Sequence, residues 1–297
     1  MANLETPTLR PEKQNTRTFR HVLSVILRDP LSLASTIAII LFVVVAIFSN
    51  QIAPFPLEGA GKTNVSNSML PPSWEHPFGA DKLGRDVLSR VIVGAQPALI
   101  IPIGVVLFAI VIGAPLGALA GYKGGWVDEL IMRITDLFLA FPSLLLAMAI
   151  ASALGRGLGK AAFALVISWW PWYTRLVRGV TISLKERYFV EAAKATGVRD
   201  SVIILRHILP NTISPILVQA TVDLGTVILA MGGLAFLGLG TQPPAPDWGL
   251  MVSEGRTYIL TQPWIATFPG IAIFVIVLAF NLLGDTLRDI FDPRQYL

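Results

Sequence analysis

The sequence predicts an all-α integral membrane protein with six transmembrane helices. Of its 297 residues, 54% are hydrophobic and only 14% are charged, and the mean hydropathy is +0.66. Soluble domains carry about 25% charged residues, so this chain has too few charges to cover a surface that faces water. The composition therefore excludes a disordered chain, and the absence of cysteine excludes a disulfide scaffold.

Charge-poor intervals indicate where the six helices lie. A spanning helix needs about 20 predominantly apolar residues, because lipid cannot hydrogen-bond to exposed backbone groups. The intervals that we interpret as spans lie at about 31–49, 90–123, 136–156, 160–175, 213–236 and 265–283. The fourth is short and ends among Trp and Tyr residues that suit the membrane interface, and the fifth is interrupted by Asp223.

The distribution of Lys and Arg predicts that both termini are cytoplasmic. With that orientation, 16 of the 23 basic residues lie in cytoplasmic segments, as the positive-inside rule requires. Seven of these 16 lie in a single segment, 175–206. The high pI of about 9.5 is therefore interpreted as a sign of membrane topology rather than of nucleic-acid binding.

These assignments divide the chain into five regions. We expect them to be a cytoplasmic tail at 1–30, the first transmembrane helix at 31–49, an extracytoplasmic loop at 50–90, a five-helix core at 91–287 and a cytoplasmic tail at 288–297. In the first tail, apolar residues recur at helical spacing, which indicates either an amphipathic helix on the membrane surface or a cytosolic continuation of the first span. These residues are Phe19, Val22, Leu23 and Ile26.

The sequence offers no recognisable catalytic or metal-binding constellation. It has no cysteine, and its three histidines lie in separate segments without metal-ligand spacing. The residues 61–63 resemble the end of a phosphate-binding loop, but Pro56 stands where that loop needs its first glycine, and the flanking strand and helix are missing. We therefore expect no enzymatic activity and no ATP binding by this chain.

Two features inside the expected spans have structural and functional interpretations. Gly113, Gly117 and Gly121 form a doubled small-residue motif, which lets helix backbones approach closely either within the chain or against a partner subunit. Asp223 is an acid deep in an apolar span, where a carboxylate must face protein or a water-filled cavity. It either lines a path through the membrane, together with Gln219, or is a structural acid satisfied by a hydroxyl of a neighbouring helix.

The cytoplasmic connection at 175–210 is the most informative segment. Residues 185–195 favour a helix, Gly197 suits the left-handed position that follows a helix, and the helical pattern resumes toward Pro210. The segment is therefore expected to form a helix–glycine–helix hairpin. Such a basic hairpin is either a solvated loop or a docking element.

This hairpin resembles the EAA loop of ABC-importer membrane subunits, whose pattern is E-A-A-x3-G-x9-I-x-L-P. The matching residues are Glu191, Ala192, Ala193, Gly197, Leu209 and Pro210. His207 stands at the isoleucine position, a departure that affects packing only. Four other segments resemble the C-type permeases of dipeptide and oligopeptide importers, and they lie at 76–90, 132–136, 236–244 and 281–293. Each motif alone is weak, but five in the right order are highly specific.

The resemblance implies a type I ABC importer (MetI-like) permease fold, with five core helices and an extra N-terminal one, in a prokaryotic plasma (inner) membrane. It also implies a second homologous permease, two cytoplasmic ATPases that bind ATP and Mg²⁺, and an extracytoplasmic binding protein. In that family the hairpin, here 181–210, is the coupling helix that fits a groove on the ATPase. No cofactor is implied for this chain itself.

The resemblance further implies alternating access driven by the ATPases, with di- or oligopeptides as the cargo. Related permeases carry glutathione, nickel chelates or oligosaccharides instead, so these cargoes remain alternatives. An ion-coupled secondary transporter is the competing class. It is disfavoured because a lone Asp223 is a poor ion relay and the two halves of the chain show no paired broken helices.

Overall fold

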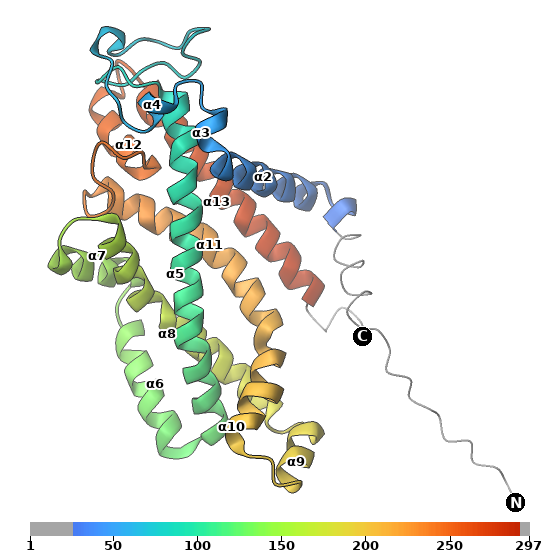
Figure 1. Cartoon of the computed structure of the whole chain (residues 1–297). Helices are drawn as coiled ribbons and strands as arrows, with labels where there is room; N and C mark the ends of the chain where they lie inside the picture. Colours follow the sequence, from blue (N-terminus) through green and yellow to red (C-terminus); the bar gives the residue numbers. More distant parts are fainter. Residues whose placement is uncertain (1–25, 292–297) are drawn as a thin grey trace, which may run out of the picture.

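The computed structural model describes residues 26–291, and over this range the chain is an elongated bundle of helices (Figure 1). Its helices are α2 Pro30–Ile47, α3 Ser49–Ile52, α4 Pro56–Gly59, α5 Val87–Lys123, α6 Gly125–Leu139, α7 Ser143–Leu154, α8 Leu158–Leu184, α9 Tyr188–Ala195, α10 Asp200–Ile203, α11 Ile213–Phe236, α12 Trp248–Gly255 and α13 Trp264–Phe291. No strand forms between residues 26 and 291, where the only bridge joins Ala80 to Asp86. The all-α prediction is confirmed.

Four stretches within the described range are long and apolar enough to cross a membrane. They are α2, α5, α13 and Asp200–Phe236, which ends in α11. The pair α6 and α7 is a fifth candidate. The helix α8, at the fourth predicted span, has 27 residues and is long enough to cross a membrane, but it is less apolar than the other five. These elements correspond to the six predicted spans. The predicted amphipathic segment at 19–26 lies outside the described residues except for Ile26.

The prediction of the third span as one helix is wrong. The helix α6 already begins at Gly125 and ends at Leu139, and the chain bends by 83° before α7 begins at Ser143. Proline cannot continue the hydrogen-bond ladder, and it disfavours helical geometry in the residue before it, so the break falls at Phe141 and Pro142. Because apolar residues continue through the break, hydropathy alone does not reveal it.

The helix α5 runs along most of the bundle and packs closely against α8 (Figure 1). Glycines spaced by four residues make this possible. A Cβ atom added at Gly113 would lie 2.5 Å from the Trp170 carbonyl oxygen, and one at Gly117 would lie 2.4 Å from that of Thr174. A Cβ at Gly121 would meet α8 at 2.8 Å. This glycine stripe is therefore covered by α8 of the same chain and is not free for a partner subunit.

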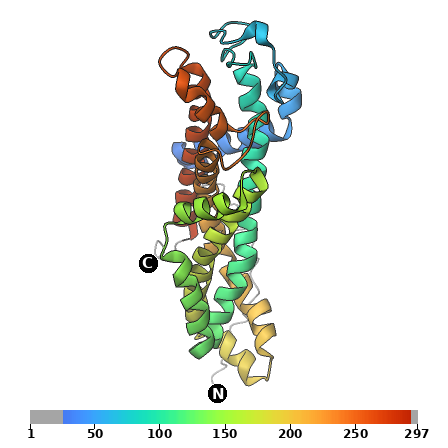
Figure 2. The ribbon, with the colours of Figure 1, turned by 90° about the vertical axis from the view of Figure 1, so that its left-hand side faces the viewer.

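Two hydrophobic clusters form the core. One joins α5, α7, α8 and α11 to the segment around α9 and α10, through buried residues such as Leu165, Val190 and Ile203. The other joins α2, α5, α12 and α13, with Phe42 and Trp248 among its members. Figure 2 shows that the bundle is long and narrow, with the segment before α5 at one end and α9 at the other. The final helix α13 reaches residue 291, so the predicted tail at 288–297 begins as helix.

Candidate functional site

The first residues of the predicted hairpin, 181–184, belong to the end of α8. The rest, 185–210, is called the coupling hairpin below and projects from one end of the bundle (Figures 1 and 2). Its first helix, α9, begins at Tyr188, three residues later than the sequence predicts. Val190 is fully buried and anchors α9 to the core, whereas Tyr188 is 89% exposed. Glu191 and Ala192 are also exposed. The helix therefore presents a mixed aromatic, acidic and small-residue face to its surroundings.

Gly197 ends α9 in the geometry expected of a helix terminus. Its φ angle is +78°, a left-handed conformation that favours glycine. The Gly197 N–H donates to the Lys194 carbonyl at 3.0 Å, and the Val198 N–H donates to that of Ala193 at 3.1 Å. This pair of bonds is a Schellman motif, which satisfies helix carbonyls that would otherwise lack a partner. The sharp turn between the two halves of the hairpin thus depends on this glycine.

The second half of the hairpin returns to the membrane through an irregular helical segment. It consists of α10, a π-helical turn at Ile204–Ile208 and a 3₁₀ turn at Leu209–Thr212, which leads into α11. Ile203 and Ile208 are fully buried, so they fix this half to the core. The ring of His207 lies 6.5 Å from that of Phe189, which places it among packing residues. All six EAA-loop residues lie in this one hairpin.

Asp223 and Gln219 lie together on α11, one helical turn apart. The Gln219 amide donates from Nε2 to Asp223 Oδ1 at 3.1 Å. The Asp223 side chain is buried, and its other oxygen, Oδ2, has no hydrogen-bond partner among the described residues. Polar side chains of Trp169 and Tyr173 of α8 lie close to the carboxylate across the helix interface. The carboxylate therefore faces α8 of its own chain rather than an open surface.

A cleft of about 460 Å³ opens between α8, α11 and α13, beside this pair. Its lining includes Ser214, Gln219, Asp285 and Arg288, together with apolar residues of the same helices. Of the two predicted path residues, Gln219 lines the cleft and Asp223 does not. Ser214 lies at the start of the predicted span 213–236, and Asp285 and Arg288 lie beyond the predicted span 265–283, so most of the polar lining gathers where these spans end.

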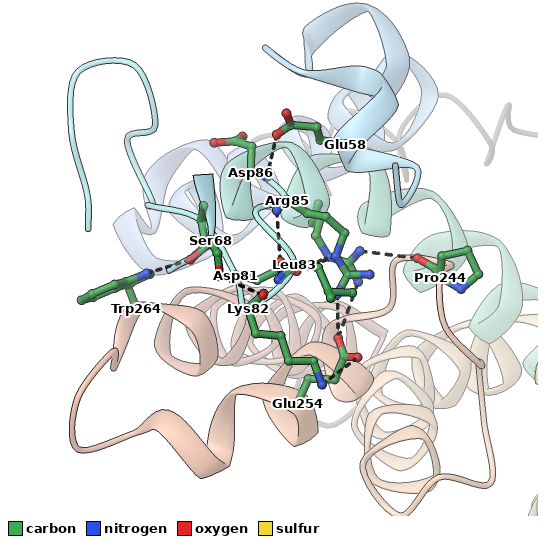
Figure 3. Close-up of polar contacts among 12 residues, drawn as sticks. Glu58, Ser68, Asp81, Lys82, Leu83, Arg85, Asp86, Pro244, Glu254 and Trp264 are labelled. Carbon is green, nitrogen blue, oxygen red and sulfur yellow. Dashed lines mark hydrogen bonds and ion pairs between the residues drawn. The ribbon is translucent and has the colours of Figure 1, made fainter. Parts of the chain in front are cut away.

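At the end of the bundle opposite the coupling hairpin, two arginines and two carboxylates form a buried ionic cluster (Figure 3). We define this cluster as Asp81, Arg85, Arg90 and Glu254. Arg85 Nε lies 2.6 Å from Asp81 Oδ2, and its Nη2 lies 3.1 Å from Glu254 Oε2. Arg90 approaches the same carboxylates at 3.7 and 3.9 Å. Both arginine side chains are 1% exposed. Because Glu254 belongs to α12, the cluster joins α12 to the start of α5.

Further polar contacts hold the segments around this cluster. Asp86 caps α5 by accepting from the Ser89 N–H at 2.7 Å, and its Oδ1 lies 2.9 Å from His76 Nδ1. The Asp86 N–H donates to Glu58 Oε2 at 3.0 Å (Figure 3). Asp247 caps α12 by accepting from the Leu250 N–H at 3.0 Å, while burial raises the pKa of the Asp247 carboxyl. The predicted loop at 50–90 is thus folded around the start of α5.

Comparison with known proteins identifies the family. Residues 113–295 match the family described as binding-protein-dependent transport system inner membrane component. This match covers more than half of the chain. The chain belongs to this family of transporter permeases. Residues 18–72 also match the N-terminal transmembrane domain of oligopeptide transport permease C. The permease is therefore a multi-pass inner-membrane protein.

Two relatives of the permease cover nearly its whole length. It is 44% identical over 287 residues to the dipeptide transport system permease protein DppC of Alkalihalophilus pseudofirmus, a match that spans 96% of this chain and 93% of the relative. It is 46% identical over 272 residues to the glutathione transport system permease protein GsiD of Escherichia coli, spanning 90% and 88%. Both are ABC importer permeases, so the family suggested by the EAA loop is confirmed.

A solved structure supports the fold of the permease. The match is to a chain of the MetNI methionine ABC transporter in an inward-facing conformation, with a TM-score of 0.53 and 20% sequence identity. It covers 69% of the permease and 97% of that chain. At this identity the likeness concerns the fold alone, and it confirms the predicted MetI-like architecture.

The buried ionic cluster of the permease is the feature that sequence reasoning missed. The segment 76–90 was singled out only for its resemblance to related permeases. Five charged residues within ten positions, directly before an apolar span, are the available signal: Asp81, Lys82, Arg85, Asp86 and Arg90. Their partner Glu254 lies more than 160 residues away along the chain, so the pairing could not be predicted from local spacing.

Proposed function

We propose that the permease forms half of the translocation pathway of an ATP-driven importer that takes up di- or oligopeptides. In this proposal it pairs with a second, homologous permease, and two cytoplasmic ATPases bind ATP and Mg²⁺ and perform the hydrolysis. An extracytoplasmic binding protein delivers the cargo. The observation that carries the proposal is the exposed coupling hairpin, which projects from the bundle and contains the complete set of EAA-loop residues.

In this proposal both termini and the coupling hairpin are cytoplasmic. The seven basic residues at 175–206 favour that orientation through the positive-inside rule. The exposed face of α9, with Tyr188, Glu191 and Ala192, would then meet the ATPase. Closure of the ATPase dimer on ATP moves the hairpin, and the bundle changes from inward-facing to outward-facing. Such a change requires contacts that differ between the two states.

The path for the cargo is proposed to run along the cleft between α8, α11 and α13. Gln219 is the path residue in this scheme, because it lines the cleft. Asp223 lies outside the cleft and orients the Gln219 side chain by accepting its 3.1 Å hydrogen bond. The second permease would cover the open side of the cleft.

Glutathione is the second candidate cargo. The GsiD relative, which is 46% identical over 272 residues, is a glutathione transport permease, whereas the DppC relative, which is 44% identical over 287 residues, is a dipeptide transport permease. Glutathione is itself a small peptide with free carboxylates. A transport path for either cargo must therefore accommodate a short peptide backbone with charged groups.

Reconstitution tests the proposal. The permease is purified with its partner permease and ATPases, placed in liposomes, and supplied with the cognate binding protein and either radiolabelled dialanine or radiolabelled glutathione. We expect uptake of dialanine that requires ATP, magnesium and the binding protein. Uptake of glutathione alone would replace the peptide cargo with the second candidate. Uptake by liposomes that contain this chain without ATPases would contradict the importer and support a secondary transporter.

A further inference from the structure

A carboxylate at the start of α10 ties the coupling hairpin to the last turn of α5. Asp200 accepts from Tyr122 Oη through Oδ1 at 2.9 Å and from Lys123 Nζ through Oδ2 at 2.6 Å. On the α9 side, Lys194 Nζ lies 4.9 Å from the centre of the Tyr122 ring, a cation–π contact. Both arms of the hairpin therefore contact Tyr122 at the end of α5, and the α10 arm also contacts Lys123.

Apolar packing lies beneath these polar contacts. Tyr122 is buried in the same hydrophobic cluster as Val190, Ile203 and Ile208 of the hairpin. The Lys123 and Asp200 side chains are 44% and 50% exposed. The buried residues hold the hairpin against the helix, but apolar contacts are non-directional and restrict the angle between them less than hydrogen bonds do. A carboxylate held from two sides restricts that angle.

The end of α5 is in turn braced against its neighbours. The glycine stripe packs α5 on α8, and α6 follows α5 directly after Gly124. Two ion pairs join α6 to α8: Arg178 Nη2 lies 2.6 Å from Asp128 Oδ2, and Arg175 Nη2 lies 2.6 Å from Asp136 Oδ1. A displacement passed to the last turn of α5 would therefore move three helices together.

We propose that Asp200 is the positioning residue that makes the coupling hairpin and α5 move as one unit. This inference rests on the proposed function, since it concerns how movement of the hairpin reaches the helix bundle. Without Asp200 the hairpin keeps its exposed α9 face but can rotate against α5. The ATPases then hydrolyse ATP while less of the movement reaches the transport path.

The first test measures uptake per ATP hydrolysed in the reconstituted complex, with dialanine or glutathione as the probe, whichever the wild type transports. We expect Asp200→Ala to lower this ratio by about tenfold, the scale of one half-exposed ion pair plus one hydrogen bond, while the ATPase rate is retained. The matched control is Ser201→Ala, at the next and likewise exposed position. A misfolded variant would lower ATPase rate and uptake together, so the ratio separates loss of positioning from loss of structure.

The second test replaces the ion pair with a covalent link. The chain has no cysteine, so Lys123→Cys with Asp200→Cys introduces its only two thiols. We expect the double variant as isolated to show the lowered uptake per ATP of Asp200→Ala, and to regain the wild-type ratio after treatment with a short bismaleimide. Each single variant, treated in the same way, is the control for reagent effects.

The outcomes separate this inference from the proposed function. If the wild-type complex shows no ATP-dependent uptake, the proposed function fails and the inference falls with it. If the wild type is coupled and Asp200→Ala is equally coupled, the inference alone is overturned. A cross-link that blocks uptake would also overturn it, because that result would mean that the hairpin must move relative to α5 during transport.

Discussion

Replacing Gly117 with alanine would place a methyl group in the tightest contact of the α5–α8 interface. The added Cβ would lie 2.4 Å from the Thr174 carbonyl oxygen and 2.9 Å from the Arg178 backbone nitrogen. Ordinary van der Waals contact begins near 3.4 Å, so the helices must separate by about 1 Å. The atoms in the way belong to the α8 backbone and cannot rotate aside as a flexible side chain would.

The expected loss of stability follows from two opposing terms. Overpacking of this kind costs about 1–3 kcal/mol, while alanine in place of glycine stabilises a helix interior by about 0.5–1 kcal/mol. The net result is a free energy of unfolding lowered by roughly 1–2 kcal/mol. Thermal unfolding of the detergent-solubilised complex measures it as a decrease in Tm, by about 2–4 °C per kcal/mol in chains of 150–250 residues.

Gly104→Ala is the matched control, because Gly104 lies on the same helix and a Cβ there would meet nothing within 4 Å. We expect this variant to be as stable as the wild type or slightly more stable. If Gly117→Ala unfolded at the same temperature as Gly104→Ala, the close backbone contact between α5 and α8 would be refuted.

Two more predictions concern the two ends of the bundle. Glu254→Ala leaves the two buried arginines with Asp81 as their remaining carboxylate, so the free energy of unfolding should fall by about 3–5 kcal/mol in a thermal or denaturant titration. Lys82→Ala, which removes a more exposed charge next to Glu254, should change stability little, and equal losses in both variants would argue against the buried cluster. Gly197→Asp puts a side chain at φ +78°, a strain of roughly 1–2 kcal/mol, and should lower uptake per ATP while membrane insertion is retained. Thr196→Asp adds the same charge at an ordinary backbone position. If it lowered uptake per ATP as much as Gly197→Asp does, the added charge rather than the strained turn would be the cause.

The sequence predicted the helical membrane architecture because long apolar intervals have few other solutions. Hydropathy did not reveal the break at Pro142. The apolar pattern continues through the 83° bend between α6 and α7, because the bend depends on backbone geometry at the proline and not on polarity. The left-handed turn at Gly197 followed from its position after a helix-forming segment, and its φ angle agrees with that expectation. Local rules therefore located elements and turns but not breaks inside apolar runs.

Contacts between distant segments were beyond sequence reasoning. The sequence does not say whether the glycine motif packs against another part of the chain or against another subunit. The three-dimensional structure shows that it packs against α8. Asp200 and Glu254 carried no local signal, because each meets its partners from a remote part of the chain. For Asp223 the sequence indicated a buried, functional or structural acid, and the structure adds that it faces α8 next to Tyr173.

Photo-crosslinking shows directly which protein touches the exposed face of α9. Benzoylphenylalanine is introduced in place of Tyr188, and the intact complex is irradiated in membranes. The same probe in place of Trp74, an exposed residue of the segment before α5 at the far end of the bundle, is the control. We expect the probe at position 188 to capture an ATPase subunit and the probe at position 74 not to capture one. Capture of the ATPase from position 74, or its absence at position 188 in an intact complex, would contradict the assignment of the coupling hairpin.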